Sequence, residues 1–98
     1  MEITYKNKRI AKVCTCFEEA TKKYNFDMAK IIHRRVGEII AADTVELMIE
    51  HRIGRCHPLT GNRKGQYALD LVHPFRLIFE KHGKQIQIAH IVEITDYH

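Results

Sequence analysis

The sequence lacks long apolar runs, internal repeats, low-complexity segments and linkers. A membrane-spanning helix needs about 18 or more consecutive apolar residues, and no stretch approaches that length, so we expect no membrane span and no membrane partner. No positively charged segment followed by an apolar one begins the chain, which makes a cytoplasmic protein the default expectation. A length of 98 residues is typical of one domain, and we predict that residues 1–98 form it.

Cysteine is also scarce, and its spacing does not fit a metal site. The three cysteines are Cys14, Cys16 and Cys56, an odd number with no second pair at zinc-ligand spacing. Cys14 and Cys16 lie in a helical pattern, where residues two apart point to different faces. We therefore expect reduced thiols that pack as small hydrophobes, and we predict no metal and no other cofactor.

Acidic residues are outnumbered by basic ones. Lys plus Arg minus Asp plus Glu is 16 − 12 = +4, with a sequence pI near 9.1. This balance favours an anionic partner, either nucleic acid or an acidic protein. Residues 51–64 contain four Arg or Lys, two His and no acid. Taken alone, such a cluster is most simply a solvated basic loop.

The first half of the chain has helical periodicity. Residues 2–6 resemble a short strand, and apolar residues then recur at intervals of three and four over residues 10–24, which predicts one helix that Asn25 can end. Asp27 can cap a second helix with an apolar stripe over residues 28–40. Asp43 and Thr44 can open a short third helical turn, with Glu46 placed to reach back to the cap.

The second half changes to strand patterns after a loop rich in Gly, Pro and Asn. Strand-like runs cover residues 66–72, 75–80 and 85–97. Alternation in the first two predicts one apolar face, with Arg76 on the other face; the apolar face would hold Tyr67, Leu69, Leu71, Phe75, Leu77 and Phe79. Helices followed by strands predict an α+β domain, in which two main helices and a short helical turn pack on one face of a curved antiparallel sheet of about four strands.

The last run has an informative alternation. If its pairing is regular, Ile86, Ile88, His90, Val92, Ile94, Asp96 and His98 share one face. Tyr97 would then lie on the opposite face, and a β-bulge would change the pattern. Under regular pairing, Asp96 and His98 can act together.

Several side chains have the chemistry needed to cleave RNA without a metal. In that reaction a base removes the 2′-hydroxyl proton, the oxygen attacks the adjacent phosphorus, and an acid protonates the leaving oxygen. Histidine suits both roles, and arginine offers a planar donor fork for the developing charge. The candidates are His57, Arg76, Asp96, Tyr97 and His98.

Individually, each candidate has a simpler interpretation. His57 can be an ordinary surface residue, and His98 can belong to a frayed end. Asp96 can pair with a Lys or Arg, and Tyr97 can serve packing. Arg76 can form a cross-strand pair with Glu93 or Asp70.

Together, these residues match a known pattern. Arg55-x-His57-Pro58-Leu59-x-Gly61, Lys64-Gly65, Phe75-Arg76-Leu77-Ile78-Phe79 and Asp96-Tyr97-His98 resemble HigB-type toxins of the RelE/ParE superfamily of type II toxin–antitoxin systems. The resemblance covers the C-terminal half in motif detail. It implies a RelE-like fold and a ribosome-dependent endoribonuclease (mRNA interferase) that cuts messenger RNA in the ribosomal A site and inhibits translation.

The resemblance also implies roles for individual residues. The catalytic set would be His57, Arg76, Asp96, Tyr97 and His98, and the RNA-binding set Arg52, Arg55, Arg63 and Lys64. Which histidine is the base stays open; our hypothesis is that His98 is the base and is oriented by Asp96. The implied partners are a cognate HigA-like helix-turn-helix antitoxin, the ribosome and mRNA, with operator DNA bound only through the antitoxin.

The sequence departs from many relatives in having no tryptophan. Tyr67 and Phe75 stand where those relatives have Trp, and both keep aromatic bulk.

Two other functions are alternatives to the nuclease. One is a ParE-like toxin that inhibits DNA gyrase, although that branch lacks the terminal Asp-Tyr-His and the His-Pro-Leu loop. The other is an RNA-binding module whose histidines are structural.

Overall fold

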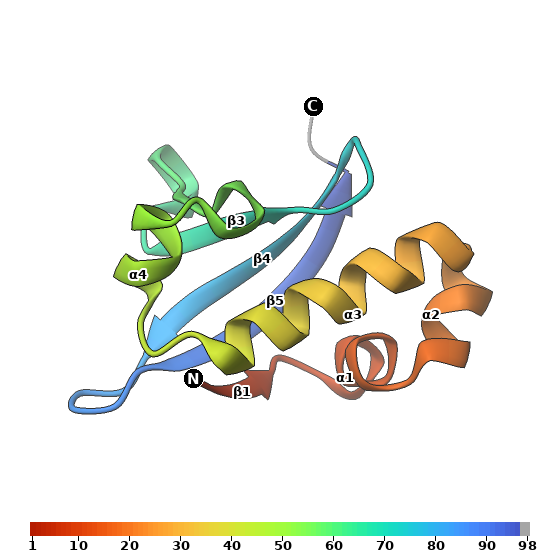
Figure 1. The fold of residues 1–98 in the computed structure, drawn as a ribbon, viewed down its shortest axis with the longest axis horizontal. Coiled ribbons are helices and arrows are strands. Elements are labelled where there is room, and N and C mark those ends of the chain that lie inside the picture. The colour runs from red at the N-terminus through yellow and green to blue at the C-terminus, as the bar shows by residue number, and fades with distance from the viewer. Residues whose placement is uncertain (97–98) are drawn as a thin grey trace.

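The computed structural model describes residues 1–96, so the predicted roles of Tyr97 and His98 lie outside the described residues. Within that range, helices pack against a five-stranded sheet in the order β1-β5-β4-β3-β2 (Figure 1). The elements in chain order are β1 (Glu2–Tyr5), α1 (Lys8–Thr15), α2 (Phe17–Lys23), α3 (Phe26–Ala41), α4 (Val45–Glu50), the short 3-10 turn η1 (Ile53–Arg55), β2 (His57–Pro58), the 3-10 turn η2 (Gly61–Arg63), β3 (Gln66–Asp70), β4 (Phe75–His82) and β5 (Ile88–Asp96).

The helices form where the pattern predicts them, but two of their boundaries differ. The single helix predicted over residues 10–24 is wrong, because Cys16 is extended (φ −120°, ψ 111°) and separates α1 from α2. The predicted cap at Asp27 is also wrong. The Asn25 side chain accepts from the Met28 N–H at 2.8 Å, so Asn25 caps α3. Asp27 instead lies in the first turn, where its charge suits the helix dipole.

The cap of α4 is Thr44, whose hydroxyl accepts from the Leu47 N–H at 3.1 Å. The predicted reach of Glu46 back to the cap is not found. Its carboxylate accepts from Lys81 Nζ at 2.8 Å and from the Gln87 side chain at 2.7 Å. The Gln87 side-chain oxygen in turn accepts from the Val45 N–H at 2.8 Å. Glu46 thus ties α4 to the far end of the β4–β5 hairpin.

The sheet is mixed, which corrects the expectation of an antiparallel sheet of about four strands. Strands β2, β3, β4 and β5 pair antiparallel in succession, whereas β1 pairs parallel with β5. A parallel pair needs a long crossover, and the helices between β1 and the later strands provide one. The fifth strand is β2, which contains only His57 and Pro58 and was expected as loop.

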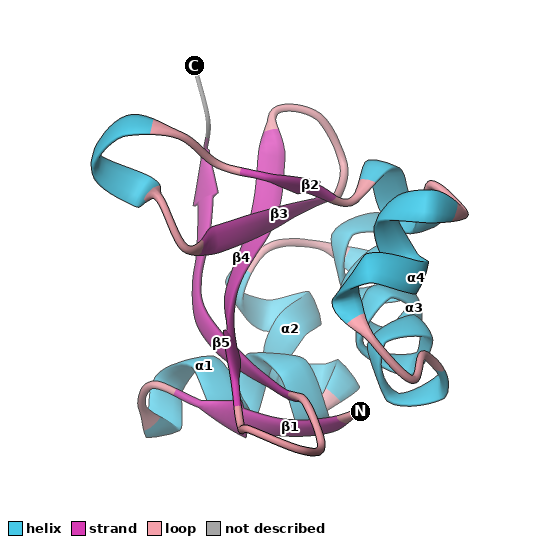
Figure 2. Ribbon diagram, turned by 90° about the vertical axis from the view of Figure 1, so that its left-hand side faces the viewer, coloured by secondary structure: helices cyan, strands magenta, loops and turns pink. Residues whose placement is uncertain are grey.

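The predicted apolar face is confirmed. The main core joins the helices to one face of the sheet; its sheet residues include Tyr67, Leu69, Leu71, Phe75, Leu77, Phe79, Ala89 and Ile91. The opposite face has a small cluster of Leu59, Ala68, Ile78 and Val92. Figure 2 shows α3 and α4 on one side of the sheet and η2 on the other. We call the side without these helices the outer face.

A β-bulge interrupts β5. Ile78 pairs with Glu93 and Phe79 pairs with Ile91, so Val92 is an extra residue on β5. Residues opposite each other in a ladder share a face. His90, opposite Glu80, therefore lies on the outer face, whereas Asp96, opposite Phe75, lies on the helix-covered face. The regular alternation predicted from Ile86 to Asp96 is therefore wrong, and Ile86 precedes the strand.

The cysteines behave as predicted where the core contains them. Cys14 and Cys56 are free and buried in the main core, and burial raises the pKa of their thiols to about 12 and about 11, respectively. Cys16 is free and half-buried.

Across residues 1–96, every helix is too short or too polar to cross a bilayer.

Candidate active site

An open pocket of about 450 Å³ lies between the end of α4 and the start of β4. Its lining residues are Ile49, Arg52, Arg55, Cys56, His57 and Arg76. Arg76 follows the basic segment by about twenty residues in the chain. The two lie together because β2 pairs with β3 and β3 pairs with β4. Three guanidinium-bearing residues and one imidazole share this pocket.

The basic segment has an unusual backbone. Arg52 (φ 53°), Gly54 (φ 56°) and Arg55 (φ 54°) all adopt the left-handed conformation. That region is sparsely populated for residues with a side chain, and such strain gathers at functional sites. Arg35 of α3 packs beneath the segment, because a Cβ added at Gly54 would meet Arg35 Nε at 2.8 Å. The backbone therefore presents Arg52 and Arg55 to the pocket at a cost that tertiary contacts must offset.

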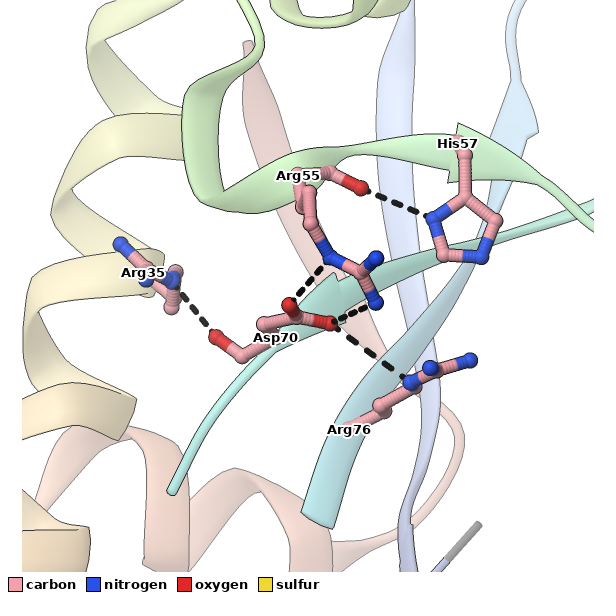
Figure 3. A network of polar contacts seen from close by, with 5 residues as sticks. All are labelled: Arg35, Arg55, His57, Asp70 and Arg76. Carbon is pink, nitrogen blue, oxygen red and sulfur yellow. Dashed lines mark hydrogen bonds and ion pairs between the residues drawn. The ribbon is translucent and has the colours of Figure 1, made fainter. Parts of the chain in front are cut away.

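Asp70, at the end of β3, is the centre of the polar contacts in the pocket (Figure 3). Its carboxylate accepts from Arg55 Nε at 2.6 Å and from Arg55 Nη2 at 3.3 Å. Arg76 Nε lies 3.5 Å from Asp70 Oδ1, and this is one of the two cross-strand pairs that the simpler interpretation of Arg76 allowed. Arg35 Nε donates to the Asp70 backbone carbonyl at 2.7 Å. The hydrogen bond and charge of Asp70 raise the pKa of the Arg55 guanidinium.

His57 has a defined ring orientation. Its Nδ1 lies 2.8 Å from the carbonyl oxygen of Arg55. A carbonyl only accepts, so Nδ1 must bear the hydrogen and donate it. In the neutral ring, Nε2 is then the nitrogen with a free lone pair. In Figure 3 the ring lies above the guanidiniums of Arg55 and Arg76, and all three residues line the pocket.

The predicted RNA-binding residues fall into two groups. Arg52 and Arg55 line the pocket. Arg63, on η2, donates to the Gln66 side chain at 2.9 Å and forms an ion pair with Glu93. Lys64 is exposed directly after η2. Arg63 and Lys64 thus lie on the outer face beyond the pocket, where Lys64 adds positive charge and the charge of Arg63 is paired with that of Glu93.

Asp96 is not among the residues that line the pocket. The ladder places it opposite Phe75, whereas Arg76 lies between Asp70 and Thr95. The described residues therefore bring His57 and Arg76 together and place Asp96 on the other face of the sheet. The predicted cooperation of Asp96 with Tyr97 and His98 falls on residues outside the described range.

Two residues of the site were not predicted as functional. Asp70 was considered only as a partner of Arg76, and Arg35 was assigned no role. Asp70 had a local signal, since an acid at the end of one strand and an arginine at the start of the next face each other across a hairpin. Arg35 had no such signal. Among residues 1–96, no group of three or more His, Cys, Asp or Glu is placed to hold a metal ion.

Comparison with known proteins gives the class of fold. Neither a protein-family model nor a curated protein matches the sequence. Among solved structures, the chain is similar to the YoeB/ParE toxin from Agrobacterium tumefaciens, with a TM-score of 0.62 and 12% identity over 100% of both chains. It is also similar to the YoeB dimer from Staphylococcus aureus, with a TM-score of 0.56 and 17% identity over 100% of this chain and 97% of that one.

At these identities the similarity concerns the fold. The α+β arrangement of helices on a mixed five-stranded sheet is a RelE/YoeB-like fold. This confirms the predicted fold class, with the corrections to strand number and direction given above.

Proposed function

We propose that this protein is the toxin of a type II toxin–antitoxin system, of the HigB type, and that it is a metal-independent endoribonuclease acting on mRNA in the ribosomal A site. The fold is similar to that of toxins. The observation that most supports the nuclease is the pocket in which His57 Nε2 is free to exchange a proton beside Arg52, Arg55 and Arg76. An imidazole and several guanidiniums are the groups that cleavage through the 2′-hydroxyl requires.

In the proposed reaction, the arginines bind the scissile phosphate and stabilise the charge that develops on its oxygens. The 2′-oxygen attacks phosphorus, the 5′-oxygen leaves, and the products are a 2′,3′-cyclic phosphate and a 5′-hydroxyl. His98, the proposed base, takes the proton of the 2′-hydroxyl, and His57 gives a proton from Nε2 to the leaving 5′-oxygen. Tyr97 and His98 complete the proposed catalytic set, and Asp96, which does not line the pocket, is proposed to orient His98 from the end of β5.

The proposed partners follow from the same function. The ribosome would hold the mRNA in an attack-ready geometry, which a domain of 98 residues with an open pocket is poorly suited to impose by itself. A HigA-like helix-turn-helix antitoxin would neutralise the toxin and bind operator DNA for the pair. The net charge of +4 suits both RNA and an acidic protein surface.

The test is cleavage of mRNA on purified ribosomes programmed with a defined message. We expect 5′ ends that map to the A-site codon with the wild-type protein. A message with a 2′-O-methyl group at the scissile nucleotide should stay intact, because the attacking oxygen is blocked. The His57→Asn and Arg76→Ala variants should lose most of the cleavage.

A matched control is Lys84→Ala, at the exposed β4–β5 tip and therefore away from the pocket. It removes one positive charge, as Arg76→Ala does, and should cleave like the wild type. Cleavage of the 2′-O-methyl message, or none by the wild type on ribosomes, would contradict the proposal. Inhibition of purified gyrase by a protein that leaves the mRNA intact would favour the ParE-like alternative.

A further inference from the structure

The Asp70 carboxylate contacts the guanidinium groups of Arg55 and Arg76, which in the proposed function bind the RNA phosphate. Two nitrogens of Arg55 contact the carboxylate at 2.6 and 3.3 Å, and Arg76 Nε lies 3.5 Å away. This fork is the one through which arginine binds either a carboxylate or a phosphate in bidentate fashion. One acidic side chain therefore faces two of the three arginines that line the pocket.

We propose that Asp70 is a positioning residue that holds the Arg55 fork in the RNA-free protein and yields it to an RNA phosphate on binding. This inference rests on the proposed function, because it assumes that the ligand of the pocket is RNA. In the free protein, Asp70 offsets the repulsion between the guanidiniums of Arg55 and Arg76. In the complex, a phosphate takes over that role for Arg55.

The exposure of the side chains supports an exchange of partners. The Arg55 side chain is 65% exposed, compared with 24% for Arg76 and 32% for Asp70. An exposed ion pair contributes little net stability, so an incoming phosphate can replace it at small cost. Arg76, which is more buried, is the partner better placed to keep its contact with Asp70.

Asp70 itself is fixed from the opposite side. Its backbone carbonyl accepts from Arg35 Nε, and Arg35 also donates to Glu38 at 2.8 Å. The contact with Arg35 uses the backbone of Asp70, so it does not depend on the carboxylate. A change of the side chain alone can therefore remove the proposed competition while leaving this anchor in place.

The test compares the wild type with Asp70→Asn, which keeps the shape of the side chain and removes its charge. The probe is a fluorescent single-stranded RNA with 2′-O-methyl groups throughout, which the proposed reaction cannot cleave. Binding is followed by anisotropy at several salt concentrations, both free in solution and with the RNA placed in the A site of ribosomes. We expect Asp70→Asn to bind the RNA about 3- to 10-fold more tightly than the wild type. We also expect the slope of log K against log salt concentration to be steeper by about 0.7, because one more guanidinium is released to contact a phosphate.

Glu46→Gln is the matched control. It also raises the net charge by one and breaks an ion pair, but that pair is with Lys81, at the opposite end of β4 from Arg76. Its affinity should rise less than that of Asp70→Asn, and its salt slope should match the wild type. In the double variant Arg55→Ala/Asp70→Asn, the gain in affinity should largely disappear, because the fork is absent.

Kinetics give a second readout. On ribosomes, Asp70→Asn should lower the KM for mRNA by a larger factor than any change in kcat. Weaker RNA binding by a folded Asp70→Asn protein, or an unchanged salt slope, would overturn the inference while wild-type cleavage still upheld the nuclease. Tighter binding by Asp70→Asn with no cleavage by the wild type would uphold an RNA-phosphate site and overturn the nuclease. Failure of the wild type to bind RNA in either setting would overturn both.

Discussion

The Nδ1 atom of His57 lies 2.8 Å from the carbonyl oxygen of Arg55, a residue held at φ 54°. This contact links the imidazole to the strained segment that presents the arginines of the pocket. The orientation of the ring and the position of the Arg55 guanidinium therefore depend on the same peptide unit. Any backbone change at residues 52–55 should disturb both together.

The contact allows a sharp substitution at His57. In His57→Asn, the side-chain amide can still donate to the Arg55 carbonyl, but no nitrogen exchanges a proton. We expect cleavage on ribosomes to fall by about 10²- to 10⁴-fold, whereas thermal unfolding changes little because His57 is only half-buried. Cleavage at the wild-type rate by His57→Asn would show that the imidazole is not part of the reaction.

Gly54 should be intolerant of any side chain. An alanine there must adopt φ 56°, and its Cβ would lie 2.8 Å from Arg35 Nε. We expect Gly54→Ala to lower the free energy of unfolding by more than about 1 kcal/mol and to reduce RNA binding, because Arg35 must move. Urea unfolding and RNA binding measure the two effects.

The control for this prediction is Gly37→Ala. Gly37 lies inside α3, and a Cβ there would meet nothing within 4 Å. Alanine favours a helix interior over glycine by about 0.8–1 kcal/mol, so this variant should be more stable than the wild type. If Gly54→Ala and Gly37→Ala changed the free energy of unfolding in the same direction, the proposed contact between Gly54 and Arg35 would not explain the effect of Gly54→Ala.

The sequence allowed the general fold and half of the site to be predicted. Hydrophobic alternation placed Arg76 on the face opposite Leu77 and Phe79, and the strand ladder agrees. Alternation did not reveal the bulge at Val92, because Ile91 and Val92 are adjacent, apolar and both buried, so the sequence does not show which of them is the extra residue. That bulge decides the face on which Asp96 lies. Arg35 was equally invisible, because its contact with Asp70 joins residues 35 apart in the chain.

The pH dependence of stability should reveal the contact between α4 and the β4–β5 hairpin. The hydrogen bond from Gln87, and then that from Lys81, lower the pKa of the Glu46 carboxyl from 4.5 to about 2. Between these values the unfolded chain binds more protons than the folded one, so stability rises with pH. The contribution of Glu46 is fully present above pH 4.5 and is lost as the pH falls toward 2.

We therefore expect Glu46→Gln to be less stable than the wild type at neutral pH, with a difference that shrinks as the pH falls from 4.5 to 2. Urea unfolding at a series of pH values measures it, and added salt should reduce it because the pair is exposed. Glu2→Gln, which removes an exposed carboxylate of β1 for which residues 1–96 offer no ion pair, is the matched control for the change in net charge. A difference independent of pH would mean that Glu46 acts through packing alone.

We expect Leu59→Ala to lower both the free energy of unfolding and the affinity for RNA. Leu59 is 7% exposed and packs on Ala68, Ile78 and Val92, and its N–H donates to the Gln66 carbonyl at 2.8 Å. These contacts hold the loop that carries Arg63 and Lys64 against the sheet. Large-to-small substitutions of buried leucine cost about 2–5 kcal/mol, and the small size of this cluster favours the lower end for Leu59→Ala.

The same variant should weaken RNA binding even where it remains fully folded, because the loop would lose its position on the outer face. Val72→Ala is the control: it shortens an apolar side chain that is 41% exposed and should change both quantities little. Urea unfolding gives the stability, and anisotropy well below the unfolding midpoint gives the affinity. If folded Leu59→Ala bound RNA as the wild type does, Arg63 and Lys64 would not contribute from a fixed position, and the RNA-binding surface would reduce to the pocket of Arg52, Arg55 and Arg76.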